Sequence, residues 1–295
     1  MRTSKSSWYQ ESEKTALLRS KPTGGRTGDE LSVQFVDADV VTRLVTPEAE
    51  IWSGPWKWEA TADGIPLTSA GSWEEVCWHS DKDVDYLELE LPLRDGWRLQ
   101  RQMLLARHDA FLLLADILLS PPETYESDDT AEPLEIHHSL EFSLSAGIRT
   151  QAEKESRELL LLSGKKRLAL ALPLALPEWR AEYAPGDLQS AGQTLQLKTA
   201  IRGKNLYAPL WIDLDPTRIR KPLTWRRLTV AQALEIQPRD VAVGYRVQVG
   251  AGQWLVYRSV ADKGNRTVLG QNYATEFICC RFLANGETED ILEIE

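Results

Sequence analysis

Cysteine is scarce in this sequence, and the three residues present exclude two kinds of stabilising framework. Cys77, Cys279 and Cys280 form no CxxC pair, so neither a zinc ribbon nor a disulfide scaffold is indicated. Cys279 and Cys280 are neighbours in a stretch that we interpret as a strand, so their side chains should point to opposite faces, and a bridge between them would be strained. We expect free thiols and a reducing compartment.

Positive charge is also in short supply. The 295 residues include 34 Lys and Arg against 44 Asp and Glu, which gives a formal net charge of −10. Binding to nucleic acid needs a surplus of cations over a contiguous face, so we expect no nucleic-acid partner. No apolar run is long enough to span a membrane, and residues 1–28 contain no apolar segment of a secretory signal. These absences predict a cytoplasmic protein without membrane contact.

The common motifs of catalytic and cofactor sites are missing as well. There is no GxSxG elbow, and "GAGQWL" lacks the third glycine of a dinucleotide-binding loop. Only four histidines occur, and His137 and His138, adjacent in a predicted strand, cannot both face one ion. We therefore expect no metal and no cofactor. No catalytic residue can be named, which leaves enzymatic activity open but favours its absence.

What the sequence does contain is a period of two. In "DYLELEL" the leucines 87, 89 and 91 share one face and the glutamates 88 and 90 share the other, as a half-buried strand requires. Runs such as "AFLLLADILL" and "EFICCRFLA" are separated by turn residues, among them Arg-Asp-Gly and Asn-Gly. Strands follow one another without crossover helices. The sequence predicts an all-β fold, a large antiparallel two-sheet stack with few short helices.

The expected organisation is simple. Residues 1–28 are charged and end in a Gly-rich stretch, which predicts a flexible N-terminal tail. Residues 29–295 are expected to form a single large β-sandwich domain. The best candidate for a short helix is "LTVAQALEI", residues 228–236.

Three aspartates at alternate positions stand out in "VCWHSDKDVDYLELEL": Asp81, Asp83 and Asp85. Counted from Asp81, the positions where an EF-hand loop needs Gly and Glu hold Tyr86 and Pro92, so that calcium motif fails. We interpret the stretch as the mouth of a β-hairpin in which Asp side chains cap backbone amides.

A second carboxylate pair lies in "WIDLDP". In a strand Asp213 and Asp215 would share one face at a spacing of about 7 Å, a geometry compatible with paired-carboxylate glycoside chemistry. Alternating aspartates before a Pro-Thr turn are equally typical of a surface, and we favour that interpretation.

The most distinctive polar stretch is "RIRKPLTWRRL", residues 218–228, a cationic segment in an acidic chain. Arginines there could clamp an anionic glycan, with an indole as a stacking platform. The alternative is pairing with carboxylates of neighbouring strands. The candidate ligand-binding residues are Arg218, Arg220, Lys221, Trp225, Arg226 and Arg227.

The segments "WRLQRQMLLARHDAFLLLADILLSPP" and "LEIHHSLEFSLSAG" resemble the β-sandwich half of heparinase II/III-like polysaccharide lyases, with Arg101, Asp116 and His138 at the pattern positions. The resemblance implies a supersandwich fold and a history in glycan metabolism. The family's N-terminal helical toroid is not expected here, because only a short polar tail precedes the predicted sandwich. The HxHxDxG-like and AHN-like stretches have no match, so no catalytic residue is carried over.

Three functional hypotheses follow. The first is a non-catalytic carbohydrate-binding or assembly module related to polysaccharide-processing enzymes, with an anionic glycan as partner. The second is a lyase- or epimerase-like enzyme that uses a His/Tyr pair, which needs His137 or His138 near a Tyr and an Arg. The third is a structural protein-interaction module. The sequence leaves open whether His79, Asp116 and His138 meet in space.

Overall fold

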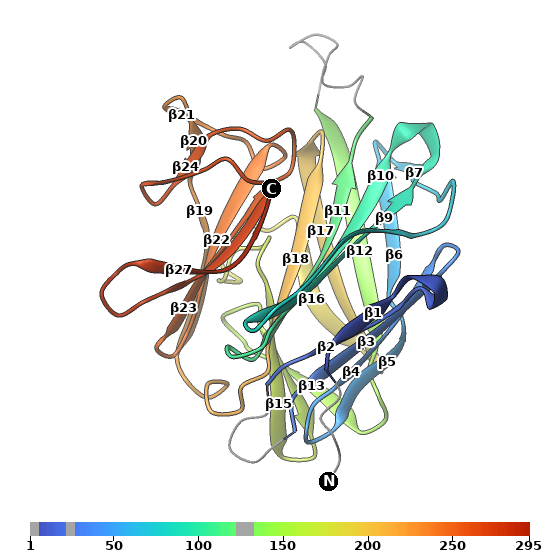
Figure 1. Ribbon diagram of the computed structural model, residues 1–295, viewed down its shortest axis with the longest axis vertical. Coiled ribbons are helices and arrows are strands. Elements are labelled where there is room, and N and C mark those ends of the chain that lie inside the picture. Colours follow the sequence, from blue (N-terminus) through green and yellow to red (C-terminus); the bar gives the residue numbers. More distant parts are fainter. Residues whose placement is uncertain (1–5, 22–26, 122–132) are drawn as a thin grey trace.

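The structure is a computed structural model, and it describes residues 6–21, 27–121 and 133–295 (Figure 1). These residues form 27 strands and two single-turn 3₁₀ helices, η1 (Glu11–Glu13) and η2 (Arg94–Gly96). The strand pairings within the described part of the chain are antiparallel throughout, so the predicted all-β antiparallel fold is confirmed. Neither helix of the described residues has the length or apolarity to cross a membrane.

The strands form five sheets, each named here and given in spatial order. The N-terminal sheet contains β1 (Trp8–Gln10), β2 (Thr15–Arg19), β3 (Glu30–Val36), β4 (Asp39–Val45) and β5 (Glu50–Pro55). The β12 sheet contains β16 (Gly186–Ala191), β17 (Thr194–Gly203), β12 (Leu134–Ser143), β6 (Lys57–Ala62) and β7 (Ile65–Pro66). The central sheet contains β13 (Ile148–Ala152), β14 (Leu159–Ser163), β15 (Lys166–Pro173), β18 (Leu206–Asp213), β11 (Phe111–Leu119), β10 (Arg98–Ala106), β9 (Val84–Pro92) and β8 (Glu74–Ser80).

The remaining two sheets lie towards the C-terminus. The β22 sheet contains β19 (Leu223–Leu228), β22 (Ala242–Val249), β23 (Gly252–Ser259), β26 (Phe277–Phe282) and β27 (Thr288–Ile294). The hairpin sheet contains β21 (Glu235–Ile236), β20 (Val230–Gln232), β24 (Arg266–Val268) and β25 (Gln271–Tyr273).

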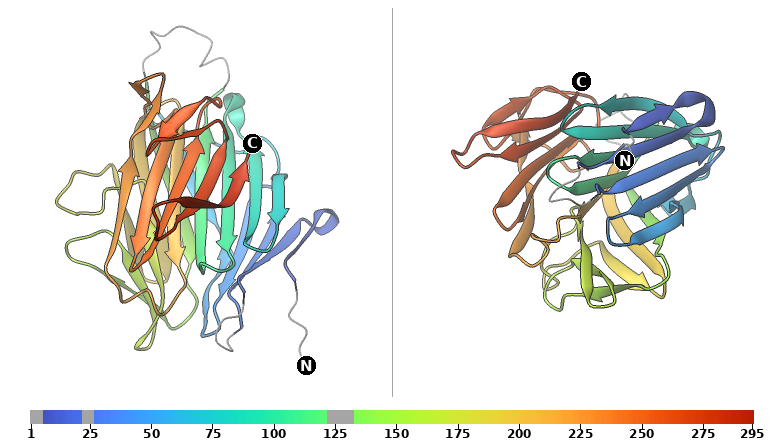
Figure 2. Two further views of the ribbon diagram at one scale, coloured as in Figure 1. Left: turned by 60° about the vertical axis from the view of Figure 1, so that its left-hand side comes forward. Right: turned by 60° about the horizontal axis from the view of Figure 1, so that its bottom comes forward.

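The sheets stack in layers, which Figure 2 shows edge-on in its left panel. The N-terminal and β12 sheets together cover one face of the central sheet, and the β22 sheet covers the other, with an apolar core in each interface. A smaller core separates the β22 sheet from the hairpin sheet. Because β11 is buried on both faces, its sequence "FLLLADILL" is apolar at every position except Asp116, instead of alternating. The stack therefore has more layers than the two sheets expected from the sequence.

Two features link the layers. Cys279 lies in the core between the central and β22 sheets, and Cys280 lies in the core under the hairpin sheet, which confirms that the neighbouring thiols face opposite sides. Arg258 of β23, 1% exposed, donates to Glu88 Oε1 of the central sheet at 2.8 Å and to Gln100 Oε1 at 2.9 Å. A buried ion pair thus joins two layers that are far apart in sequence.

The expectation of a flexible tail over residues 1–28 is wrong for residues 8–19. These residues form β1, η1 and β2, and β2 pairs with β3 in an antiparallel register. The physical reason is that Ala16 and Leu18 fill the core of the first layer, with 2% and 0% exposure. Residues 1–5 and 22–26 of this expectation lie outside the described residues.

The helix expected at residues 228–236 is also wrong, because this segment forms the β20–β21 hairpin. Its turn residues Ala233 and Leu234 have φ values of 49° and 68°. This left-handed conformation is usual for glycine and strained for a residue with a side chain. Val230 of β20 is buried in the core between the hairpin sheet and the β22 sheet.

The aspartates that follow His79 do enter a hairpin, between β8 and β9. Asp81 Oδ1 accepts hydrogen bonds from the backbone amides of Asp83 and Val84 at 2.8 and 2.9 Å, which confirms the capping interpretation for Asp81. Asp85 has a different role: it is fully buried and accepts a hydrogen bond from the Arg19 amide at 2.8 Å. It therefore fastens the N-terminal sheet to the central sheet.

Candidate functional site

The outer face of the β12 sheet carries rows of polar side chains. In β12 the inward residues Ile136, His138 and Leu140 are buried, so the alternate residues point away from the core. His137 lies opposite Thr61 of β6 and Ala200 of β17, and the next row on the same face is Glu59, Ser139 and Lys198. Hydrogen-bond donors and acceptors thus alternate across three strands.

A groove runs over these rows because small side chains alternate with large ones. Thr61, Ser139 and Ala200 leave room beside their longer neighbours, and two adjoining hollows of about 560 and about 640 Å³ result. Both hollows are lined by Glu135 and Tyr183. We call this surface the Tyr183 groove.

Tyr183 stands at the edge of the groove on the loop that connects β15 to β16, and its side chain is 91% exposed. The loop is held from beneath by Arg157, which is 6% exposed and donates to the carbonyls of Pro177 at 3.0 Å, Glu182 at 2.8 Å and Trp179. A buried guanidinium that binds three carbonyls fixes the backbone of the loop. An exposed aromatic ring is therefore presented by an ordered loop.

The groove offers polar groups of both charges. His137 Nε2 lies 2.9 Å from Glu135 Oε1 on the same strand, and Glu135 lies opposite Arg202 of β17. Arg239 also lines the groove, and its Nη2 donates to the carbonyl of Ala175 at 2.7 Å. An aromatic ring beside alternating donors and acceptors is the usual composition of a surface that binds hydroxyl-rich ligands.

The three residues that carry the sequence resemblance come together, but in the core. Arg101 Nε donates to Asp116 Oδ1 at 2.8 Å, and His138 Nε2 lies 3.0 Å from Asp116 Oδ2, with all three side chains fully buried. The Arg101 guanidinium also stacks 4.2 Å from the ring centroid of Trp56 and 4.8 Å from that of Trp73.

The electrostatics of this cluster are those of a structural ion pair. Burial raises the pKa of Asp116, but Arg101 and His138 together hold that pKa below its usual value. The cluster joins β10, β11 and β12 and has no access to solvent. His79 lies elsewhere, with its Nε2 3.4 Å from Asp81 Oδ2 at the β8–β9 hairpin, so Asp116 and His138 meet without it.

The cationic segment is divided by the fold. Arg218 is bound inward: its Nε donates to Asp213 Oδ2 at 3.1 Å, and its guanidinium lies 4.9 Å from the Trp254 ring centroid. Trp225 is 1% exposed, and its Nε1 donates to the carbonyl of Leu176 at 2.9 Å. The expected stacking role of Trp225 is therefore wrong, because β19 turns the indole into the core between two sheets.

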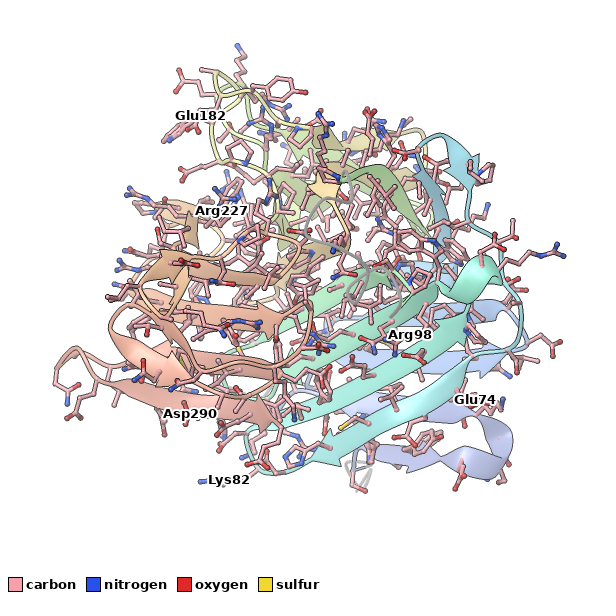
Figure 3. The ribbon with its side chains drawn as sticks, turned by 90° about the horizontal axis from the view of Figure 1, so that it is seen from above. Glu74, Lys82, Arg98, Glu182, Arg227 and Asp290 are labelled. Atoms are coloured by element: carbon pink, nitrogen blue, oxygen red, sulfur yellow. The ribbon has the colours of Figure 1, made fainter. Side chains whose placement is uncertain are left out.

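The other four cations of the segment are exposed: Arg220, Lys221, Arg226 and Arg227. Burial of part of the side chain, followed by repulsion from Arg239, lowers the pKa of Arg227. In Figure 3, Arg227 and Glu182 of the Tyr183 loop lie on the same side of the molecule, away from Glu74 and Lys82. Arg220 and Lys221 line a different hollow.

The Asp213–Asp215 pair is neither a free carboxylate pair nor simply a surface. Asp213 is fully buried, and Arg218 binds Asp213 at 3.1 Å and Asp215 at 3.5 Å. Burial, only partly offset by Arg218, raises the pKa of Asp213 to about 6. Because Arg218 pairs with both carboxylates and Asp213 is closed to solvent, the pair is not available for glycoside chemistry. Within residues 6–21, 27–121 and 133–295, no group of three or more His, Cys, Asp or Glu side chains could hold a metal ion.

Sequence reasoning missed the loop that carries Tyr183. The signal was present in "LPEWRAEYAPGD", where a Trp and a Tyr stand in a polar segment bounded by proline and glycine. Aromatic residues in such a segment cannot all enter a core, because the backbone around them has no strand to place them there.

Solved structures with a similar fold include heparinases. Heparan sulfate lyase HepC from Pedobacter heparinus is similar over 88% of this chain, with a TM-score of 0.58 and 8% sequence identity. A heparinase III gene product is similar over 87%, with a TM-score of 0.56 and 7% identity. No protein-family model and no curated protein matches the sequence. At this identity the likeness shows the fold, and it confirms the resemblance to the β-sandwich of heparinase-type lyases.

The similar region is only a part of those enzymes. It covers 43% of the chain of each of these two proteins, so this chain spans less than half their length. More than half of each of those two chains lies outside the similar region.

Proposed function

We propose that this protein binds a carbohydrate chain, and that the Tyr183 groove is the contact surface. The observation that carries the proposal is Tyr183 itself, 91% exposed on an ordered loop beside a groove of alternating donors and acceptors. An aromatic ring exposed on an ordered loop is available to pack on the apolar face of a ligand, and its hydroxyl can stay in water. A pyranose offers an apolar face for the ring and hydroxyls for His137, Ser139 and Lys198.

The likeness to heparan sulfate lyases supports an acidic glycan as the first ligand to test. Lys198, Arg202 and Arg239 all line the groove. The groove also contains Glu59, Asp63 and Glu135, so its cations can bind a carboxylate or sulfate group while its carboxylates accept hydrogen bonds from sugar hydroxyls.

Isothermal titration of heparan sulfate oligosaccharides into the wild type and Tyr183→Ala tests this proposal. Loss of one aromatic contact of about 1.4 kcal/mol should raise Kd about tenfold, while Tyr183→Phe should keep most of the affinity. Trp8→Ala is the matched control, because Trp8 is an exposed aromatic residue of the N-terminal sheet, 40% exposed, and does not line the groove. Equal affinity of Tyr183→Ala and wild type would refute the groove as the contact surface. No binding by the wild type would favour a protein-interaction module instead.

A second candidate function is a lyase-like reaction, and one observation favours it: His137 and Tyr183 line the same groove, with Arg202 and Arg239 in its adjoining part. This is the combination of His, Tyr and Arg that proton abstraction beside a uronate carboxylate requires. We expect such an activity to release an unsaturated product from heparan sulfate, visible by its ultraviolet absorbance, and to fall at least about a hundredfold in His137→Ala. A wild type that releases no such product from uronate polysaccharides would eliminate this candidate.

A further inference from the structure

A hollow of about 320 Å³, separate from the Tyr183 groove, is lined in part by Glu178 and Trp179 of the loop that carries Tyr183. Its floor is apolar, formed by Leu160, Leu170 and Ile219, and its wall includes the indole of Trp179, 48% exposed. We call it the Trp179 pocket. It lies where the end of the central sheet, the β15–β16 loop and the segment before β19 meet.

The wall of this pocket is fixed before any ligand arrives. The backbone of Trp179 bridges to that of Ser156, and its carbonyl accepts a hydrogen bond from the buried Arg157 guanidinium. Glu178 holds β19 in place, since its Oε2 accepts a hydrogen bond from the Trp225 amide at 3.3 Å. A preorganised aromatic wall loses little conformational entropy when a ligand binds.

Three cations line the pocket, Arg167, Arg220 and Lys221, together with three carboxylates, of which Glu153 is exposed, Glu178 is bound to β19 and Glu158 is buried. Arg220 and Lys221 are exposed, and within the described part of the chain none of the three side chains has a hydrogen-bond or ion-pair partner. By contrast, Arg218 in the same segment is bound to Asp213 and Asp215. The three cations of the pocket are therefore available to a ligand.

The floor also contains a buried carboxylate. Glu158 is 6% exposed, and its Oε2 has no hydrogen-bond partner among the described residues. A buried acceptor without a partner is costly, and a hydroxyl or amide N–H of a ligand would relieve that cost. A simple inorganic anion would not, because Glu158 would repel it. The pocket thus selects a ligand that carries both an anionic group and hydrogen-bond donors.

We propose that the Trp179 pocket binds an acidic sugar residue. Its sulfate or carboxylate is held by Arg167, Arg220 and Lys221, its hydroxyls donate to Glu158, and its apolar face packs on the Trp179 indole. The inference rests on the proposed function in one respect, that the ligand is a saccharide.

The two surfaces are close enough for one chain to occupy both. Trp179 and Tyr183 lie on the same loop, and four residues of backbone span at most about 14 Å. A glycan chain that crosses the loop would place one sugar on each aromatic ring. The pocket would then supply the preference for acidic over neutral chains, and the groove would bind both.

Titration calorimetry of the whole chain with two probes tests this inference. The probes are a heparan sulfate octasaccharide and the same octasaccharide with its sulfates removed and its carboxyls reduced. For Arg220→Ala/Lys221→Ala we expect Kd for the acidic probe to rise tenfold or more, with a weaker salt dependence, and Kd for the neutral probe to stay unchanged. Arg226→Ala/Arg246→Ala removes two exposed cations from the β22 sheet, outside the pocket, and should change either Kd less than twofold.

The outcomes separate the two proposals. Wild-type affinity of Arg220→Ala/Lys221→Ala for the acidic probe, or an equal loss in the control variant, overturns the pocket and leaves the groove intact. Loss of acidic-probe binding in the pocket variant but not in Tyr183→Ala supports the pocket and overturns the groove. A wild type that binds neither probe overturns both.

Discussion

At the scale of single residues, burial decides which polar groups are available for function. Arg101, Asp116 and His138 are chemically suited to a site, but each is fully buried and engaged with the others. Tyr183 and Trp179 carry less distinctive chemistry, but they are exposed beside hollows. Sequence could name the first three, because their positions follow a strand pattern. It could not show that the pattern turns them inward.

Asp213 provides a residue-scale prediction of pH dependence. Its pKa in the folded protein is about 6, above the usual value of 3.8, because burial outweighs Arg218. Between these values the folded state binds more protons at this site than the unfolded state, so the stability it contributes falls as pH rises from 4 to 6. Over this interval the change is about 2 kcal/mol, because the carboxyl of the unfolded chain is already largely ionised at pH 4.

Urea unfolding of the wild type and Asp213→Asn between pH 4 and 7 measures this contribution. The variant cannot titrate at this position, so the free energy of unfolding of the wild type relative to the variant should decrease by about 2 kcal/mol as pH rises from 4 to 7. Asp187→Asn, an exposed partner of Arg180 at 3.2 Å, should show no comparable slope. A difference that grows with pH would mean that Arg218 outweighs burial.

At the scale of elements, the errors of prediction have identifiable causes. Residues 228–236 carry apolar side chains at spacings that fit a helix, and their turn lacks the Asn-Gly that normally announces a hairpin. Tertiary pairing of β20 with β24 overrides local preference and places Ala233 and Leu234 at positive φ. The prediction of a flexible tail failed because the N-terminal residues contain few apolar side chains and give little local signal for a strand. They form β2 because β3 is available to pair with it.

Other elements were predictable from the sequence because apolar and polar residues alternate along strands that have one buried face and one exposed face. β3 and β4 alternate between buried and exposed positions, as one layer-facing side and one solvent side require. The polar rows of the Tyr183 groove follow the same alternation in β12, yet their role depends on which strands lie beside them. Register, unlike period, is set by contacts between distant segments.

At the scale of the whole molecule, the layers share one sheet. The central sheet is apolar on both faces, so it needs both the N-terminal and β12 sheets on one side and the β22 sheet on the other. The sequence predicted the strands of this stack but not the number of layers. A strand that is buried on both faces is apolar at nearly every position, so its sequence does not indicate which sheet covers which face. Arg258 and Glu88 fasten two layers through a pair whose partners are 170 residues apart in sequence.

This shared sheet predicts that the layers unfold as one unit. Arg258→Ala leaves Glu88, 2% exposed, without its cation, which should lower the free energy of unfolding by about 3–5 kcal/mol. Native-state hydrogen exchange on peptides from β4, β11 and β23 should report equal opening free energies in the wild type and an equal decrease in the variant. Arg98→Ala, which breaks an exposed pair with Glu90, should cost less than about 1 kcal/mol. If β4 kept its wild-type protection while β23 lost it, the layers would be independent units, and the central sheet would be stable with one face uncovered.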